Sequence, residues 1–249
     1  MKALILAGGS TDESLKDKGD NKALIKIGEK EMILYIAEVL KTIKDIDEIV
    51  AIGPKRLEGI SRGLFSVVEE EGSLFENVKK GLSIFPKEEE ILVLTSDIPM
   101  ITKEALEDFI DKAKKSGADF CYPIVRKEIN DKKFPGVKRT YVKVKEGTFT
   151  GGNVVYIKIE KVVNAVDKVE SFFKYRKNPL KLAMIFGSVF LLKFLFGTLK
   201  IEELEKRVLE LFGIKAKAII SDYPEIGTDV DKLSDLEIAE KVLTKGGGL

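Results

Sequence analysis

Glycines, a lysine and three aspartates stand at points of the sequence where they could bind phosphate groups and a metal ion. The first of these points follows an apolar strand, predicted within residues 2–7, which runs directly into Gly8 and Gly9. Because glycine has no Cβ, the backbone can turn sharply there and bring its N–H groups against an anion. An ordinary turn between a strand and a helix would explain the glycine pair equally well.

The loop that follows, from Ser10 to Asn21, contains hardly any apolar residues. We therefore expect it to be solvated and flexible, and to cover bound phosphates. It leads to Lys22, whose ammonium group could contact those phosphates.

A carboxylate follows the fourth apolar run of the chain, in the segment Leu94-Thr-Ser-Asp97-Ile-Pro99. A side chain at the end of a buried strand points into the crevice where open α/β sheets bind ligands, and Pro99 ends the strand. A hard cation bound together with phosphates needs only one or two protein carboxylates, so Asp97 is the leading candidate for a magnesium ligand. The alternative role, capping the next helix, is better filled by Thr102.

Two further aspartates, Asp229 and Asp231, lie between the last predicted strand and an amphipathic helix. They alternate along an extended segment, and we expect only one of them to face the same crevice as Asp97. Asp229 is the preferred second metal ligand and Asp231 is the alternative. Ser234 and Glu237 have the spacing of a capping box, which predicts the start of the helix.

Together these residues could transfer a nucleotidyl group. Two carboxylates from different strand ends would hold one magnesium ion, which neutralises charge, while a lysine stabilises the transition state at the α-phosphate. The composition points the same way, because the chain of 249 residues contains no histidine. This excludes histidine-based acid–base chemistry, catalytic triads that need histidine and histidine-ligated metal sites.

Charge and cysteine content narrow the class of protein further. Lys and Arg number 42 and Asp and Glu 41, so the formal net charge is +1, and nothing in this balance requires nucleic acid or a membrane surface as a partner. The single Cys121 excludes an internal disulfide and a cysteine metal cluster. Without a signal-sequence pattern at the N-terminus, we expect a cytoplasmic protein.

The elements that must position these residues alternate between strands and helices. Short apolar runs predict strands, and apolar residues at three- and four-residue spacing predict helices between them. This order indicates an α/β fold with a mostly parallel, Rossmann-like central sheet covered on both faces. The predicted strands are residues 3–6, 49–52, 66–68, 91–94 and 216–220, and the helical patterns span residues 32–43, 74–85 and 106–113.

The second half of the chain predicts a small β insert at residues 130–158. Residues 141–144 and 153–157 read as two strands around the turn Glu146-Gly147-Thr148. We expect this region to form the wall on the side where an acceptor enters, with Lys138, Arg139, Thr140, Gly152 and Asn153 as acceptor-binding residues. A tight β-turn is the plainer interpretation of the glycine pair Gly151-Gly152. We expect one domain over residues 1–245, including an apolar helical region at 179–213, and a flexible tail at 246–249.

An apolar segment at residues 182–199 is close to the length of a membrane span but carries Lys193 near its middle. A span calls for about 20 apolar residues. A buried helix is the preferred interpretation. The alternative is an interfacial helix that contacts lipid or a second subunit, which would make the protein a homodimer or a peripheral membrane protein.

Four ordered segments resemble the nucleotidyltransferases of the molybdenum-cofactor and sugar-phosphate type, over nearly the whole chain. They are Leu6-Ala-Gly-Gly9, Asn21-Lys22 to Gly28, Ser96-Asp-Ile-Pro99 and Asp229 to Leu236. The resemblance implies a GT-A-like fold and a reaction of an NTP with a phosphorylated small-molecule acceptor that releases pyrophosphate. It also implies Lys22 and Asp97 as catalytic residues, Asp97 and Asp229 as ligands of Mg2+, and a nucleotide site made of Leu6, Ala7, Gly8, Gly9, Lys22, Gly72 and Ser73. Gly72 and Ser73 could equally mark the start of a helix.

The chain departs from that family in the glycine-rich loop. An arginine is usual a few residues beyond the glycine pair, whereas residues 11–15 here read Thr-Asp-Glu-Ser-Leu, with Lys16 and Lys18 as substitutes. Lysine is a point charge without the bidentate fork of arginine. Two alternatives therefore stand beside the transferase: a nucleotide-binding regulatory protein without turnover, and a glycosyltransferase of the same fold that uses Asp97 to hold a sugar nucleotide.

Overall fold

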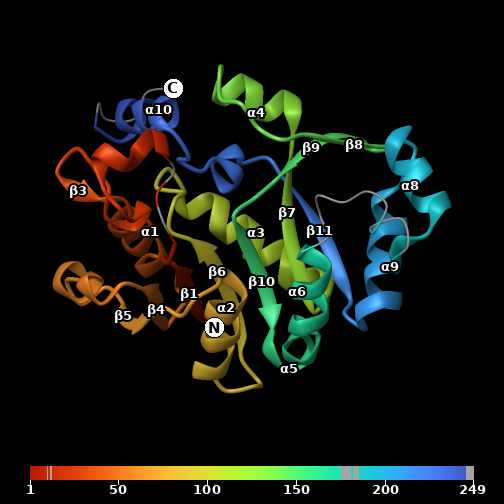
Figure 1. Ribbon diagram of the computed structural model, residues 1–249, viewed down its shortest axis with the longest axis horizontal. Coiled ribbons are helices and arrows are strands. Elements are labelled where there is room, and N and C mark those ends of the chain that lie inside the picture. Colours follow the sequence, from red (N-terminus) through yellow and green to blue (C-terminus); the bar gives the residue numbers. More distant parts are fainter. Residues whose placement is uncertain (10, 12, 175–180, 182–184, 245–249) are drawn as a thin grey trace.

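A central β-sheet with helices on both faces dominates the computed structural model, which describes residues 1–9, 11, 13–174, 181 and 185–244 (Figure 1). Nine strands of this described part form one sheet in the order β5-β4-β1-β6-β10-β7-β9-β8, with β11 paired to β7. The strands are β1 (Lys2–Leu6), β4 (Glu48–Gly53), β5 (Ser66–Glu69), β6 (Glu90–Thr95), β7 (Phe120–Arg126), β8 (Val142–Val144), β9 (Gly147–Gly151), β10 (Val154–Lys158) and β11 (Ala216–Ser221).

The predicted α/β fold class is confirmed, and the five strands predicted from apolar runs are all present. β5, β4, β1 and β6 pair in parallel, as do β7 and β11. The parallel strands in the middle, β1 and β6, are covered on both faces, which explains why they appear in the sequence as unbroken apolar runs.

Two layers of helices enclose the sheet. α1 (Met32–Lys41) and α3 (Lys103–Ser116) pack on one face, and α2 (Leu74–Ile84), α5 (Ile159–Val162) and α6 (Val166–Lys174) lie against the other. Thr102 accepts a hydrogen bond from the backbone N–H of Ala105, 3.2 Å away, so the predicted cap of α3 is confirmed. Ser73 caps α2 in the same way through the N–H of Glu76.

Shorter elements connect these layers and complete the two ends of the molecule (Figure 1). They are the β2–β3 pair (Lys26–Ile27 and Lys30–Glu31), the helices α4 (Lys127–Lys133), α8 (Ser188–Leu195), α9 (Ile201–Phe212) and α10 (Leu233–Thr244), and the 3₁₀ helices η1 (Glu13–Lys18), η2 (Lys22–Leu24), η3 (Lys55–Ile60), η4 (Val163–Ala165) and η5 (Pro224–Gly227).

The β insert differs from its predicted pairing. The turn was predicted at Glu146-Gly147-Thr148 and lies at Lys145-Glu146, so Gly147 and Thr148 belong to the returning strand. That strand is β9, which pairs with β8 and brings Val142 opposite Phe149. Residues 153–157 instead form most of β10, which runs antiparallel between β6 and β7. The prediction was wrong because a local pattern of apolar residues identifies a strand without identifying its partner.

The loop before Lys22 is also more ordered than expected. Glu13–Lys18 forms the 3₁₀ helix η1, and Leu15 is fully buried in a third apolar cluster, beside residues such as Ile25 and Phe134. Ser10 and Asp12 lie outside the described residues. Leu15 contributes to holding this loop in place, since it buries its whole side chain in that cluster.

We expect Leu15→Ala to destabilise the protein by about 2–5 kcal/mol, because it leaves a cavity in a closely packed cluster. Urea denaturation followed by circular dichroism would measure this change. Leu209→Ala is the matched control, since Leu209 is 48% exposed on α9. A loss no larger than that of the control would show that η1 does not depend on Leu15.

The last helix begins before Ser234, the residue that the predicted capping box places at the N-cap. α10 starts at Leu233, so Ser234 lies within the helix and is not its N-cap. The carboxylate of Asp235 accepts a hydrogen bond from the backbone N–H of Asp231, 3.2 Å away, and ties the preceding segment to the helix. The side chain that stabilises this turn is therefore Asp235.

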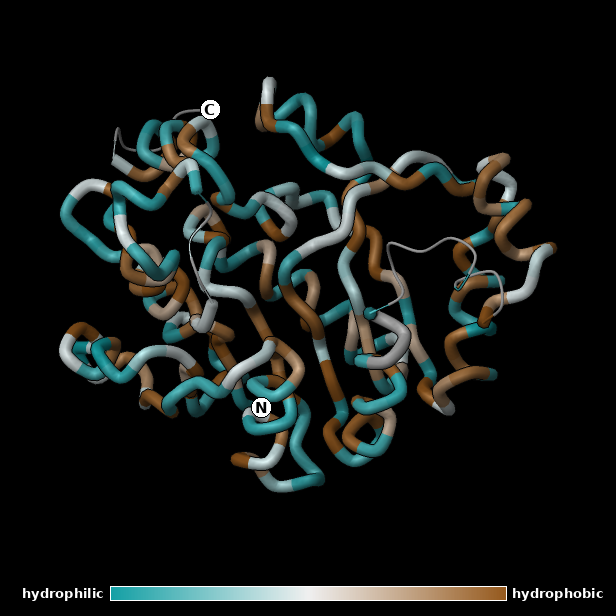
Figure 2. Tube along the Cα trace, in the orientation of Figure 1, coloured by the Kyte–Doolittle hydropathy of each residue, from teal (hydrophilic) through white to brown (hydrophobic). Residues whose placement is uncertain are grey.

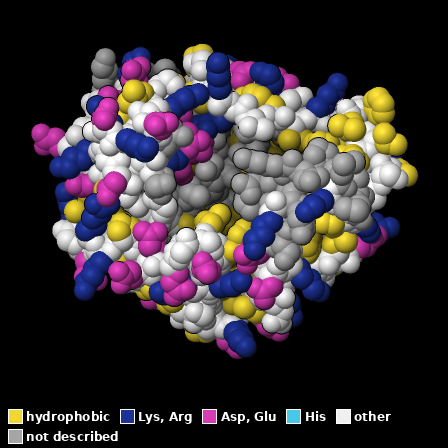
Figure 3. Space-filling model, viewed as in Figure 1, with side chains coloured by type: hydrophobic (Ala, Val, Ile, Leu, Met, Phe, Trp, Pro, Cys, Tyr) yellow, Lys and Arg dark blue, Asp and Glu magenta, His cyan; other side chains and the backbone are white. Residues whose placement is uncertain are grey.

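The apolar segment at 182–199 was predicted to be a buried helix, and this was wrong for its described part. Residues 182–184 lie outside the described residues, but none of the residues described for α8 is buried, and Val189, Leu195 and Phe196 are among the most exposed apolar side chains. Hydrophobic residues gather on α8 at one end of the molecule (Figures 2 and 3). Within the described chain, no helix combines the length and the apolarity needed to cross a bilayer.

Candidate active site

Three segments from distant parts of the sequence meet at the carboxyl ends of β1 and β6. The glycine turn follows β1, Asp97 follows β6, and the segment after η5 returns to the same edge of the sheet. The backbone N–H of Val230 donates to the carbonyl oxygen of Asp97 at 2.8 Å, and the N–H of Asn153 donates to the carbonyl oxygen of Ile226 at 2.8 Å. These bonds hold residues 226–231 beside the end of β6.

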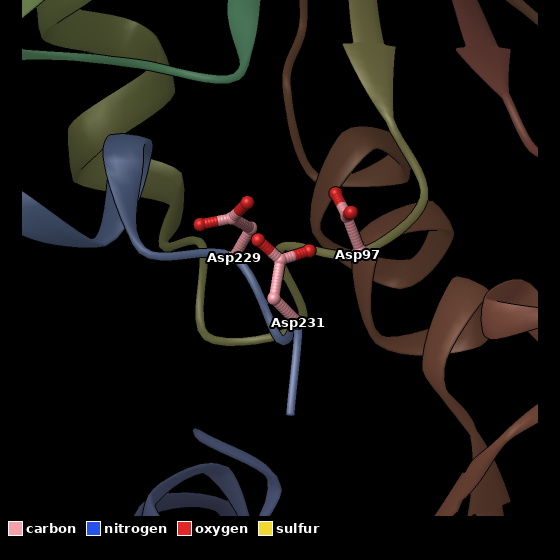
Figure 4. A group of neighbouring side chains, drawn as sticks. All are labelled: Asp97, Asp229 and Asp231. Atoms are coloured by element: carbon pink, nitrogen blue, oxygen red, sulfur yellow. The ribbon is translucent and has the colours of Figure 1, made fainter. Parts of the chain in front are cut away.

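The three aspartates form one acidic cluster, shown in Figure 4. One carboxylate oxygen from each of Asp97, Asp229 and Asp231 lies within 4.8 Å of the others. The expectation that only one of Asp229 and Asp231 faces the crevice was wrong. Residues two apart on an extended backbone point to the same side, and the residue between them, Val230, is the one that turns into the apolar core.

Lys22 lies between two of these carboxylates. Its ammonium group donates to Asp97 Oδ2 at 3.1 Å and also contacts Asp231. Burial lowers the pKa of Lys22, but the negative charges of Asp97 and Asp231 outweigh it, and the pKa of the ammonium group stays above its ordinary value. The lysine is therefore charged and held inside the cluster.

Asn21 fixes both the glycine turn and Lys22. Its amide group donates to the carbonyl oxygens of Ala7, at 2.8 Å, and Gly9, at 3.3 Å, while its side-chain oxygen accepts from the N–H of Ala23. Asn21 is buried, so it has exchanged water for these three bonds. This residue was part of the family motif, but its positioning role was not predicted.

The glycine turn has the expected open backbone. Gly9 has a φ of 97°, which glycine adopts without strain, and its N–H donates to Glu70 Oε2 at 3.0 Å. A Cβ on Gly8 would lie 2.2 Å from the same oxygen. The carboxylate of Glu70 thus occupies a backbone donor that an incoming phosphate would use.

A pocket of about 250 Å³ opens between this turn and Asp97. Six of the seven residues predicted to bind nucleotide line it, whereas the side chain of Ala7 packs into the core below. Five lining residues were not predicted as part of the site, although one of them, Glu70, follows a strand end just as Asp97 does. The lining residues are Leu6, Gly8, Gly9, Lys22, Glu70, Gly72, Ser73, Leu74, Asn77, Thr95, Ser96 and Asp97.

A larger cavity of about 830 Å³ lies on the other side of the acidic cluster. All five residues predicted to bind the acceptor line it, together with Asp229 and Asp231; the five are Lys138, Arg139, Thr140, Gly152 and Asn153. The guanidinium group of Arg139 contacts the side-chain carboxylate of Asp229 and also donates to the backbone carbonyl oxygen of Asp229 at 2.8 Å. Its side chain is only 8% exposed, and Nε has no hydrogen-bond partner among the described residues.

The arrangement supplies the parts needed for chemistry on phosphates. Three clustered carboxylates offer the oxygen ligands that hard divalent cations prefer, so the donor set fits a magnesium ion. Lys22 and Arg139 bring positive charge to the two sides of the cluster. A group held in one pocket would face a group held in the other across Asp97 and Asp231.

Comparisons with known proteins agree with this geometry. The family model of the MobA-like NTP transferase domain matches residues 3–181. A probable molybdenum cofactor guanylyltransferase of Thermococcus gammatolerans is 32% identical over 124 residues, which cover 49% of this chain and 62% of that protein. The bifunctional protein GlmU of Thermodesulfovibrio yellowstonii is 30% identical over 131 residues, 49% of this chain and 27% of that protein. The chain thus matches less than two thirds of the length of each of these two curated relatives.

Solved structures cover more of the chain. A hypothetical transferase from Thermus thermophilus superposes with a TM-score of 0.83 at 35% identity, over 94% of this chain and 98% of that chain. A 4-diphosphocytidyl-2C-methyl-D-erythritol synthase from Anaerococcus prevotii gives a TM-score of 0.62 at 13% identity, over 98% of this chain and 95% of that chain. The second likeness shows the fold alone.

Proposed function

Because the chain belongs to the MobA-like NTP transferase family, we propose that it transfers an NMP group from an NTP to a phosphorylated small-molecule acceptor and releases pyrophosphate. The acidic cluster carries this proposal. It lies between a pocket with the glycine turn and Lys22 on one side and a cavity with Arg139 on the other. We also propose that residues 1–245 act as one domain, since the site combines residues from both halves.

In this reaction an oxygen of the acceptor phosphate attacks the α-phosphorus of the NTP in line with the leaving pyrophosphate. A new P–O bond forms while the α–β bridging P–O bond breaks, and its electron pair leaves with pyrophosphate. No protein base is required, because the second pKa of a phosphate monoester is about 6 and the acceptor is already ionised near neutral pH. Positioning and charge neutralisation by the chain supply the rate.

Each side of the site has a distinct part. Lys22 would leave its carboxylate partners to contact the triphosphate. Glu70 would give up the N–H of Gly9, and the N–H groups of the turn at Gly8 and Gly9 would then hold the phosphates further from the reaction. Gly72 and Ser73 lie at the start of α2, where they would contact the base. Arg139 would orient the acceptor phosphate from the opposite side.

Asp97, Asp229 and Asp231 would hold Mg2+, which when bound neutralises charge on the phosphates. Asp97 is also oriented by a neutral donor, because its Oδ1 accepts from the hydroxyl group of Thr95 at 2.6 Å. Asp229 is already bound by Arg139, while Asp231 shares Lys22 with Asp97. All three therefore have cationic partners on the chain that fix their orientation.

A thermal-shift screen of the four NTPs, with and without magnesium, tests the donor. At a hundredfold excess over Kd, one NTP should stabilise the folded protein by about 2.7 kcal/mol, which corresponds to about 5–10 °C in the unfolding midpoint. Pyrophosphate release from that NTP, with a panel of phosphorylated acceptors, then tests transfer. The proposal fails if no NTP shifts the midpoint and no mixture releases pyrophosphate.

One observation favours a second candidate, a nucleotide-binding protein with weak turnover. Lys16 and Lys18, the substitutes for the missing arginine, are not among the described residues that line the nucleotide pocket, and Lys16 pairs with Glu13. The loop therefore brings no second cation to the phosphates. Selective NTP binding without pyrophosphate release would identify this function.

A further inference from the structure

The cavity on the acceptor side is mostly apolar, although a phosphorylated acceptor is polar at its reacting end. Its floor is one face of the sheet, made by β7, β8, β9 and β11, and α9 forms a wall. Nine of its 24 lining residues have polar or charged side chains, and four of these nine are predicted acceptor-binding residues. The apolar lining residues are Phe120, Tyr122, Ile124, Val142, Val144, Phe149, Phe186, Ile201, Leu204, Val208, Phe212, Ala216 and Ala218.

α9 turns an apolar stripe toward this cavity. Ile201, Leu204, Val208 and Phe212 follow one another at helical spacing, and all four line the cavity. A stripe of this kind normally packs into a core. Among the described residues of α9, however, none is buried.

Polar contacts tie α9 to the sheet at β11 and at the turn between β8 and β9. At its start, the N–H of Ile201 donates to the carboxylate of Glu146 at 3.2 Å. Further along, Glu205 accepts from the N–H of Ala218 at 2.9 Å and pairs with Lys217. The helix is thus fixed at its edge, and its apolar stripe stays open to a ligand.

The described residues leave part of the sheet face below exposed. Tyr122 on β7 and Ile220 on β11, the edge strand that pairs with β7, are each 37% exposed. On the opposite face, Cys121 and Ile219 are buried against the α3 side. The two faces of the same strands therefore differ in what covers them.

A second apolar cavity continues from the first. It measures about 470 Å³ and shares Phe120, Val208 and Phe212 with the larger one, as well as Gly152 and Asn153. Its remaining walls are almost entirely aliphatic and aromatic side chains from β6, β10, α2 and α6. Each cavity falls within the range of about 300–1,000 Å³ that is usual for small-molecule sites, and together they offer an extended apolar path.

We propose that the acceptor is a phosphate monoester with a long apolar chain. Its phosphate would lie at Arg139 beside the acidic cluster, and its chain would lie between α9 and the sheet. The inference rests on the proposed function and names the class of acceptor. The product is a nucleoside diphosphate joined to the apolar alcohol, formed as the acceptor oxygen bonds to the α-phosphorus and pyrophosphate leaves with the electrons of the broken P–O bond.

The exposed apolar side chains of α8 adjoin the same cavity. Phe186 lines the cavity and stacks on Phe190 of α8, with ring centroids 4.9 Å apart. On the outer surface, Leu192 and Leu195 are 52% and 68% exposed. An amphiphile could therefore reach the cavity either from solution or from a lipid surface that touches α8, and the two sources share one chemistry.

Isothermal titration of the full chain without nucleotide tests the binding of the apolar chain. We expect n-decyl phosphate, below its micelle concentration, to bind at least about 100-fold more tightly than methyl phosphate. Leu204→Asn, which places an amide in the cavity wall, should weaken decyl phosphate binding by about tenfold. Leu209→Asn is the matched control on the same helix, because Leu209 lines neither cavity, and it should bind as the wild type does.

Equal affinities for the two phosphates would overturn the inference, and so would equal losses in the two variants, which would indicate adsorption of a surfactant. Pyrophosphate release with an NTP separates this inference from the proposed function. Transfer to polar phosphates only, with none to decyl phosphate, would overturn the inference and leave the function standing. If decyl phosphate binds more tightly than methyl phosphate and the two variants behave as expected, but no NTP gives pyrophosphate, the apolar site is supported and the proposed function is contradicted.

Two arms of the transfer assay identify the source of the acceptor. Phosphatidic acid in phosphatidylcholine vesicles represents the lipid surface, and decyl phosphate in solution represents the free amphiphile. We expect transfer in at least one arm. Leu192→Asn on α8 should lower transfer in the vesicle arm alone if the acceptor is taken from the lipid surface.

Discussion

Replacing Asp97 by asparagine is expected to lower the rate of nucleotidyl transfer by about 1,000-fold or more. The carboxylate accepts a hydrogen bond from Thr95 on one oxygen and from Lys22 on the other. An amide keeps only one acceptor atom and no charge, so it cannot serve both donors. The acidic cluster would also lose one of its three negative charges, and with it much of its attraction for a divalent cation.

Pyrophosphate release at saturating NTP and acceptor would measure this loss. Asp111→Asn is the matched control, because it removes the same charge at an exposed position on α3, where Asp111 pairs with Lys115. Its activity should equal that of the wild type. A rate for Asp97→Asn within tenfold of the control would remove Asp97 from the proposed machinery.

Lys22→Ala is expected to change two measurements in opposite directions. Transfer should slow by about 100- to 1,000-fold, since a cation aimed at the phosphates stabilises charge that develops in the transition state. Divalent metal binding without nucleotide should become tighter. The ammonium group of Lys22 holds a position between Asp97 and Asp231, and its removal leaves the carboxylates without that counter-charge.

Titration with Mn2+, followed by its electron paramagnetic resonance signal, would measure metal affinity, and pyrophosphate release would measure transfer. Lys26→Ala is the control, because Lys26 is exposed and pairs only with Glu31 at 3.7 Å among the described contacts. If metal affinity fell in Lys22→Ala, the lysine would not compete with the cation, and the proposed geometry of the cluster would be wrong.

The strand ends could be predicted from the sequence, because a parallel sheet buries its strands on both faces and brings their carboxyl ends to one edge. Gly8 and Asp97 were found in this way, whereas Lys22 was predicted from its place after the polar loop and from the family resemblance. The structure brings all three together around one pocket. Glu70 stands at an equivalent strand end and was missed. Nothing in its local sequence shows that its carboxylate turns toward Gly9.

The wrong predictions have a common physical cause. The burial of a side chain and the pairing of a strand both depend on residues that are distant in the sequence. Leu15 is one apolar residue in a polar loop, and only the folded cluster around it shows that it is buried. The strand at 153–157 was identified, but its insertion between β6 and β7 depends on partners far away in the sequence. For the segment at 182–199, the apolar composition predicted that its side chains contact other apolar groups. It did not show whether those groups belong to the same chain.

The hydrogen bond from Val230 to the carbonyl oxygen of Asp97 bears on the order in which the parts of the site assemble as the chain is synthesised. The sheet strands β1, β4, β5 and β6 all precede residue 96, so most of the nucleotide pocket can form early. Asp229 and Asp231 reach Asp97 only after the chain has been made past residue 231, and such non-local contacts form late because closing the intervening loop costs entropy. The glycine turn, Lys22 and Asp97 can therefore come together before the acidic cluster is complete, and the proposed transfer would require the completed fold.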